Sequence, residues 1–160
     1  MKTIRKLRIQ SSSLILEDNL MKILDLLVLI QNNQGNQLRK RNINPEETRR
    51  HRQEAMRKLA EAYDKGKLGL SKDKTKALQL YLRATRTTMS LLVNPLDFKA
   101  IKSLKKSGNP SAADLQYIES LELMSKGKES QAMTVLTAAA EAGSANAQVA
   151  LGQAYIMKGD

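Results

Sequence analysis

The sequence contains no cysteine and only one histidine among its 160 residues. Without cysteine, a disulfide framework and thiolate chemistry are excluded, while the cellular compartment stays open. The histidine, His51, lies in an arginine-rich stretch with no serine or carboxylate that would complete a catalytic triad, so we expect it at the surface. Clusters of His, Cys and carboxylate with the spacing of a zinc site are also missing. These absences predict a protein that is not an enzyme and holds no metal.

Glycine, proline and aromatic residues are scarce, with 8 Gly, 3 Pro and an aromatic fraction of 3%. Abundant Leu, Ala, Lys and Gln favour helix over strand, and the core must be built from Leu, Ile, Ala and Met. The glycines are scattered at predicted helix ends and none forms a phosphate-binding loop, so no cofactor is expected. At this length the chain accommodates one domain with a hydrophobic core. The sequence therefore predicts an all-α protein.

Positive charge is concentrated in the first two thirds of the chain, which has a net charge of +11 as a whole. Residues 1–108 carry 24 Lys and Arg against 10 Asp and Glu, whereas residues 109–160 carry 3 against 6. This asymmetry indicates that the basic part meets an acidic protein, a nucleic acid or an anionic lipid surface. The alternative is a solvated basic surface with no specific partner.

Residues 1–44 are predicted to form an N-terminal region with a basic segment, an apolar helix and a polar linker. Four charged residues interrupt the apolar stretch Leu14–Ile30: Glu17, Asp18, Lys22 and Asp25. The stretch is therefore too charged for a transmembrane helix, and no small-residue cleavage site follows it as in a signal peptide. Its broad apolar face favours packing against neighbouring helices, a partner or a second copy of the chain. Lying on a membrane surface is the alternative.

Residues 45–160 are predicted to form a helical repeat domain whose helix starts are marked by capping residues. Three pairs, Asn44-Pro45, Asn94-Pro95 and Asn109-Pro110, have the cap-and-proline pattern of a helix start. Asp73 and Ser144 are expected to cap two further helices. The predicted helices are Pro45–Lys65, Asp73–Thr88, Leu96–Lys106, Ser111–Lys126, Glu129–Ala142 and Ala145–Lys158.

The helical domain contains an internal repeat. Two helical stripes face each other across a turn bracketed by Gly66 and Gly69, where positive φ angles are expected. The first stripe, Ala55, Leu59, Ala60 and Tyr63, recurs 92 positions later as Ala147, Leu151, Gly152 and Tyr155. The second, Ala77, Leu80, Tyr81 and Ala84, recurs 55 positions later as Ala132, Val135, Leu136 and Ala139. The offsets differ by 37, about the length of one helix-pair repeat. We expect burial between helices for Leu59, Tyr63, Tyr81, Leu136, Leu151 and Tyr155.

These residues resemble the SEL-like repeat (SLR) family, which is related to the tetratricopeptide repeats. Asp73, Lys76 and Ala77 match the opening of its second helix, and Ala139–Gly143 matches its junction between repeats. The resemblance covers Glu54–Thr85 and Gln131–Gly159. It implies a short right-handed solenoid of antiparallel helix pairs that binds proteins, with the first helix of each pair lining the concave face.

The densest positive region lies beside and within the first repeat. Its members are Arg39, Lys40, Arg41, Arg49, Arg50, Arg52, Arg57 and Lys58. Because arginine binds carboxylates through a planar fork, we predict that these residues bind an acidic protein and that the chain is an interaction scaffold or adaptor. The alternatives are a nucleic-acid-binding accessory protein that uses residues 39–58 and a membrane-surface adaptor that uses residues 14–30.

Nucleic acid is the less favoured partner, because all four tyrosines occupy helix-packing positions and none is left for base stacking. The expected compartment is the cytoplasm, with export or peripheral membrane attachment as the alternatives.

Overall fold

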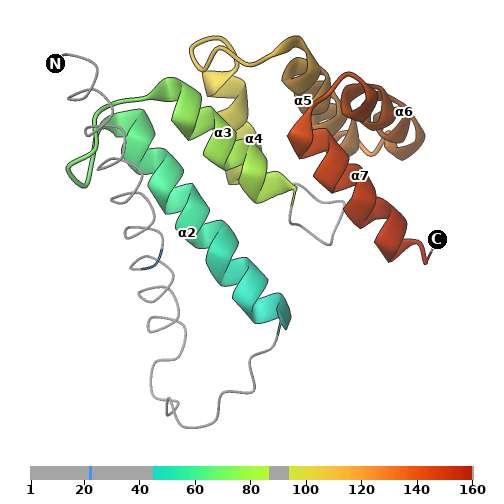
Figure 1. Cartoon of the computed structure of the whole chain (residues 1–160), viewed down its shortest axis with the longest axis horizontal. Coiled ribbons are helices and arrows are strands. Elements are labelled where there is room, and N and C mark those ends of the chain that lie inside the picture. The colour runs from blue at the N-terminus through green and yellow to red at the C-terminus, as the bar shows by residue number, and fades with distance from the viewer. Residues whose placement is uncertain (1–21, 23–44, 87–93, 160) are drawn as a thin grey trace, which may run out of the picture. The chain divides into compact units, whose positions relative to one another are not determined.

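The computed structural model describes Lys22, residues 45–86 and residues 94–159, and every regular element within them is a helix. Figure 1 shows these helices in chain order. They are α2 (Pro45–Lys65), α3 (Lys74–Thr85), α4 (Pro95–Leu104), α5 (Ala112–Ser125), α6 (Glu129–Glu141) and α7 (Ala145–Met157). The predicted all-α class is confirmed for this part of the chain. The predicted helix over Leu14–Ile30 lies outside the described residues, apart from the helical Lys22.

The chain divides into two compact units, Met1–Leu59 and Ala60–Asp160, and the boundary falls inside α2. Within the second unit, α5 packs on α6, α6 packs on α7, and α3 packs on α4. Only residues 126–128 separate α5 from α6, so the chain reverses between these two packed helices. The repeated sequence pattern predicts that residues 111–142 form an antiparallel helix pair, and the short connection between α5 and α6 agrees with that prediction.

Most helix starts follow from local capping, as the sequence predicts. The Asp73 carboxylate accepts a hydrogen bond from the Lys76 amide at 3.0 Å. The Asn94 side chain accepts from the Leu96 amide at 2.9 Å, with Pro95 in the first turn. These side chains satisfy amide groups that have no partner inside the helix.

For one predicted helix, the start is correct but the predicted capping residue is wrong. Asn109 was expected to cap the helix that begins near residue 111, but its φ angle is +47°, in the left-handed region rather than the extended conformation of a cap. Ser111 caps α5 instead, and its hydroxyl accepts from the Asp114 amide at 3.1 Å. Asn109 and Pro110 therefore lie in the turn before this helix. The cap predicted at Asn44 lies outside the described residues.

The turn between α2 and α3 needs the glycines that the sequence places there. Gly66 and Gly69 have φ angles of +67° and +75°, which confirms the predicted left-handed conformations. The Lys67 amide donates to the Ala62 carbonyl at 2.8 Å, which closes the end of α2. The Asp73 amide then donates to the Tyr63 carbonyl at 2.9 Å and joins the start of α3 to α2.

Four of the six predicted packing residues are buried: Leu59, Tyr63, Tyr81 and Leu136 are at most 6% exposed. The prediction is wrong for the last helix, where Leu151 is half-buried and Tyr155 is 47% exposed. The start of α3 lies against Tyr63, and Lys76 Nζ is 5.3 Å from the centre of its ring. Within the described residues, no helix packs over the side of α7 that carries Tyr155.

Helix α4 is held in place through one side and through the turn that follows it. Asp97, Ile101 and Leu104 are buried on that side. After the helix, the Gly108 backbone comes so close to Leu78 of α3 that an added Cβ would lie 2.8 Å from the Leu78 Cβ atom. A larger residue at 108 would force the two helices apart. The opposite side of α4 is thereby fixed toward solvent.

Candidate protein-binding surface

The predicted binding residues that the structure describes all lie on the middle turns of α2. Arg50, Arg52 and Lys58 are exposed, whereas Arg49 and Arg57 are half-buried. The other three predicted members, Arg39, Lys40 and Arg41, lie outside the described residues. We expect both members of a charge-reversal pair on this helix to be exposed, which Arg49 is only in part, so Arg50 is the better residue to change together with Arg52.

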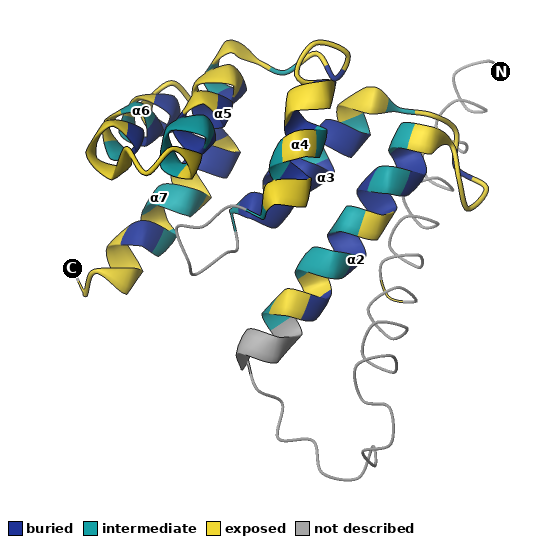
Figure 2. Cartoon of the chain, turned by 180° about the vertical axis from the view of Figure 1, so that it is seen from behind, coloured by how far each residue is buried: buried dark blue, intermediate teal, exposed yellow. Residues whose placement is uncertain are grey.

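His51 is buried, with only 6% of its surface exposed, so its predicted surface position is wrong. The reason is the helical period. His51 precedes Ala55 by four residues, and Ala55 precedes Leu59 by four, so the three side chains fall on one stripe. Ala55 and Leu59 are fully buried. Figure 2 shows these buried positions recurring along α2.

The basic side chains of α2 do not form one patch. Arg50 and Arg57 are seven residues apart and share a side of the helix, whereas Arg52 is rotated from Arg50 by about 200° around the axis. Glu54 lies on the side that Arg50 and Arg57 share, with its Oε1 atom 3.8 Å from Lys58 Nζ. A partner that contacts Arg50 and Arg52 together must therefore reach around the helix.

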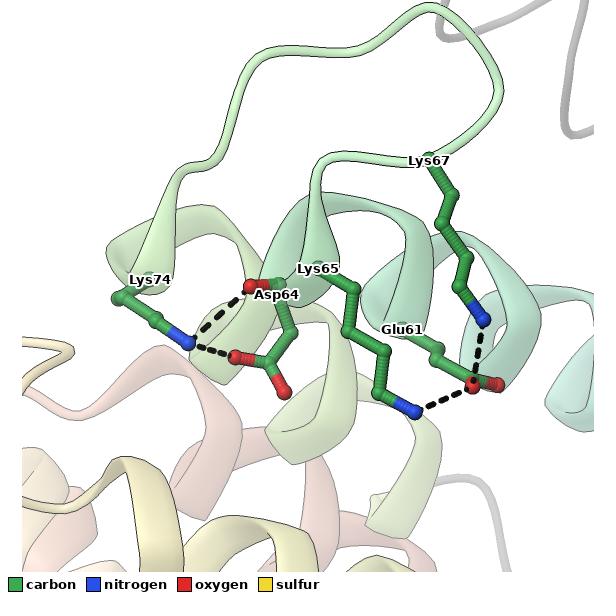
Figure 3. A network of polar contacts seen from close by, with 5 residues as sticks. All are labelled: Glu61, Asp64, Lys65, Lys67 and Lys74. Carbon is green, nitrogen blue, oxygen red and sulfur yellow. Dashed lines mark hydrogen bonds and ion pairs between the residues drawn. The ribbon is translucent and has the colours of Figure 1, made fainter.

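Three lysines around the C-terminal end of α2 are ion-paired with two carboxylates (Figure 3). Lys65 Nζ donates to Glu61 Oε1 at 2.9 Å, and Lys67 Nζ lies 3.6 Å from the same oxygen. The hydrogen bond from Lys65 holds the pKa of Glu61 below its ordinary value. Asp64 is paired with Lys74 at the start of α3. These lysines are matched by carboxylates, so the excess positive charge of α2 is confined to its earlier turns.

A buried polar cluster joins α3, α5 and the start of α7. The Asp114 carboxylate accepts from the Ser144 hydroxyl at 2.7 Å, from Gln79 Nε2 at 3.1 Å and from Asn146 Nδ2 at 3.4 Å. The Asn146 side chain also donates to Gln79 Oε1 at 3.3 Å and accepts from Arg86 at 3.4 Å. Asp114, Ser144 and Asn146 are 8%, 2% and 6% exposed. The cluster fixes how α3 meets α5 and α7.

Ser144 has two roles in this cluster. Its hydroxyl proton goes to Asp114, and its oxygen accepts from the Ala147 amide at 3.1 Å. The predicted cap of α7 is thus confirmed, and the same side chain ties that cap to α5. The tie was not predicted, because Asp114 and Asn146 follow helix caps, where polar residues are common without any tertiary partner.

A second buried hydrogen bond links α3 to α5. The Thr85 hydroxyl is 2.6 Å from the Leu82 carbonyl and 2.8 Å from the Tyr117 hydroxyl. A carbonyl only accepts, so Thr85 donates to Leu82 and Tyr117 donates to Thr85. Tyr117 is 1% exposed, and burial raises the pKa of its hydroxyl to about 12.

Because the folded pKa of Tyr117 is raised, its contribution to stability is complete below pH 10, the ordinary pKa of an unfolded tyrosine. As the pH rises from about 10 to about 12, the unfolded chain loses the proton first and stability falls by about 2–3 kcal/mol. Urea unfolding of the wild type and of Tyr117→Phe across this range isolates that loss, since the variant has no proton to lose at this position. A constant difference between the two proteins over the whole range would contradict the prediction.

Comparison of the chain with protein-family models, with curated proteins and with solved structures found no match. Within the described ranges, no three or more His, Cys, Asp or Glu side chains come together as a set that would hold a metal ion. No helix in those same ranges has the length and apolar character needed to cross a membrane. No related protein therefore informs the interpretation of the α2 surface or of the buried cluster, and only their own geometry does.

Proposed function

We propose that this protein is a non-enzymatic helical-repeat adaptor that binds an acidic protein partner through the basic residues of α2. The observation that carries the proposal is the exposure of Arg50, Arg52 and Lys58 on a helix whose other positions bury His51, Ala55 and Leu59. The buried stripe sets which side of α2 is covered, so the charged side chains are presented on the remaining sides.

Arginine predominates on this surface, and that favours carboxylates as ligands. Its guanidinium donates two parallel hydrogen bonds to one carboxylate, which gives geometric selection as well as attraction. Arg49 and Arg57 are half-buried, so their stems are restrained by neighbours and lose less freedom when a ligand binds. Because the charges extend around α2, the partner best suited to them is an acidic segment that wraps the helix rather than a flat acidic face.

The repeat arrangement belongs to the same proposal. Two observations support it: the sequence offsets that differ by 37, and the packing of α5, α6 and α7 in chain order. A right-handed solenoid of SLR type accounts for both. In such a solenoid the first helix of a pair faces the ligand, which is the place proposed for α2. The cytoplasm is the compartment that we propose for this adaptor.

Charge reversal tests the proposed surface. We expect Arg50→Glu with Arg52→Glu to weaken binding of the acidic partner by about ten- to a hundredfold, because two attractive pairs become repulsive. The partner is captured from nuclease-treated lysate on the intact chain, and its affinity is then measured by calorimetry at low and high salt. The matched control is Lys126→Glu with Lys128→Glu, which makes the same charge change at two exposed positions after α5.

Three results would count against the proposal. Binding at wild-type strength in the Arg50/Arg52 variant would show that α2 is ordinary surface. An equal loss in the Lys126/Lys128 control would show an effect of net charge alone. Disappearance of every partner on nuclease treatment would point to nucleic acid. Circular dichroism of both variants checks that the helices remain folded.

A further inference from the structure

The outward side of α4 and the turn after it carry four exposed lysines, here called the α4 lysine face: Lys99, Lys102, Lys105 and Lys106. Lys99 and Lys102 share one side of α4, opposite the buried Asp97, Ile101 and Leu104, and Lys105 and Lys106 follow in the turn after the helix. Figure 2 shows exposed residues along α4 beside the buried ones. This face belongs to a different helix from the basic surface of α2.

Little negative charge opposes this face. On α4 itself the only carboxylate is Asp97, which is 2% exposed and points away from the lysines. From α5, Glu122 Oε1 lies 4.0 Å from Lys102 Nζ. The three remaining lysines of the face have no carboxylate within 4.0 Å among the described residues. The patch therefore has a strong positive potential toward solvent.

Two apolar side chains accompany the lysines. Leu96, in the first turn of α4, is 68% exposed, and Phe98 is half-buried. Lys102 Nζ lies 4.7 Å from the centre of the Phe98 ring, so one face of the ring is covered by a cation. The exposed leucine offers one apolar side chain that can insert at the headgroup boundary while the lysines beside it meet anionic lipids.

We propose that the α4 lysine face, with Leu96, docks on an anionic membrane surface. Lysine is a compact point charge without the fork of arginine, which suits a fluid layer of headgroups better than one fixed carboxylate. Each lysine near such a surface strengthens binding by about fivefold, and Leu96 inserts at the headgroup boundary. This docking is independent of the acidic partner proposed for α2.

The same face is poorly suited to single-stranded nucleic acid. Such binding requires aromatic faces on which bases stack, and the only aromatic residue of α4 already has Lys102 over its ring. A protruding leucine also gains nothing against phosphates. An acidic protein is better matched by the arginines of α2 than by these lysines.

A single tryptophan reports docking at this position directly, since the chain contains none. We expect the emission of Leu96→Trp to shift to the blue on vesicles of phosphatidylserine and phosphatidylcholine, and to be quenched by lipids brominated in the acyl chain. Pure phosphatidylcholine vesicles should leave it unchanged. The matched control is Ile156→Trp on α7, because Ile156 is also 68% exposed; its emission should not respond.

The contribution of charge is tested in the otherwise intact full-length chain. We expect Lys99→Gln with Lys106→Gln to lower the vesicle partition coefficient by about 25-fold, the product of two fivefold losses. Lys126→Gln with Lys128→Gln changes the net charge equally and should alter it by less than about threefold. Sedimentation with the same mixed vesicles gives both values.

The proposal is overturned if Leu96→Trp shows no shift on anionic vesicles, or if Ile156→Trp shifts equally. It is also overturned if the two lysine pairs weaken vesicle binding to the same extent, which would indicate net charge alone. Loss of oligonucleotide binding in Lys99→Gln/Lys106→Gln with unchanged vesicle binding would make this a nucleic-acid surface instead. A blue shift at Leu96 alone, with the larger loss in the Lys99/Lys106 pair, supports membrane docking.

Discussion

Replacing Tyr63 with alanine is expected to lower the free energy of unfolding by about 2–5 kcal/mol, the range for large-to-small changes in a core. Tyr63 is 2% exposed, and its carbonyl accepts a hydrogen bond from the Asp73 amide just before α3. Lys76 Nζ, 5.3 Å from the ring centre, adds a cation–π contact that alanine cannot make. Urea unfolding followed by circular dichroism measures the change.

The matched control is Tyr155→Ala, at the position that repeats Tyr63 in sequence. Tyr155 is 47% exposed, so its truncation removes little packing and should cost less than about 1 kcal/mol. Equal losses in the two variants would mean that Tyr155 is covered in solution. No loss in Tyr63→Ala would contradict the packing of α3 over the end of α2.

Replacing Asp114 with alanine is expected to cost about 2–4 kcal/mol. The carboxylate accepts from Ser144, Gln79 and Asn146, and hydrogen bonds to a charged group are among the stronger ones in proteins. Alanine leaves these three donors without that acceptor in a region shielded from water. The release of a buried carboxylate from its desolvated position offsets part of the loss.

Two variants define what the Asp114 experiment measures. Asp114→Asn keeps one oxygen for Ser144 and Asn146, so it should lose less stability than Asp114→Ala. Glu119→Ala removes an exposed carboxylate from the same helix and should change stability by less than about 0.5 kcal/mol. An unchanged unfolding midpoint in Asp114→Ala would show that the cluster does not hold α3, α5 and α7 together.

Much of the secondary structure could be predicted because its causes are local. Asp73, Asn94 and Ser144 cap helices through amides two or three residues ahead, and that information lies within one turn of the chain. Gly66 and Gly69 end α2 because they adopt left-handed conformations at low cost. Asn109 shows the limit of such patterns, since Asn-Pro marks either a cap or the turn before one.

The candidate surfaces were predicted only in part. The sequence identified α2 as basic, but the buried position of His51 and the half-buried state of Arg49 depend on what packs around the helix. The sequence predicted no binding role for the lysines of α4, because that helix lies outside the repeat pattern. Their spacing was visible in the sequence, but the burial of Asp97, which removes the opposing charge from that face, was not.

The sequence by itself determined where α3, α4 and α7 begin and most of the apolar stripes of α2 and α3, because capping and helical periodicity act within a few residues. Tertiary structure alone decided which of two equivalent tyrosines is covered, since burial requires a second element: Lys76 of α3 lies over the Tyr63 ring, whereas Tyr155 is 47% exposed. It also decided that Asp114, Ser144 and Asn146 form one cluster. Asp114 lies 30 and 32 residues from these two partners, and only the packing of three helices brings them within hydrogen-bonding distance.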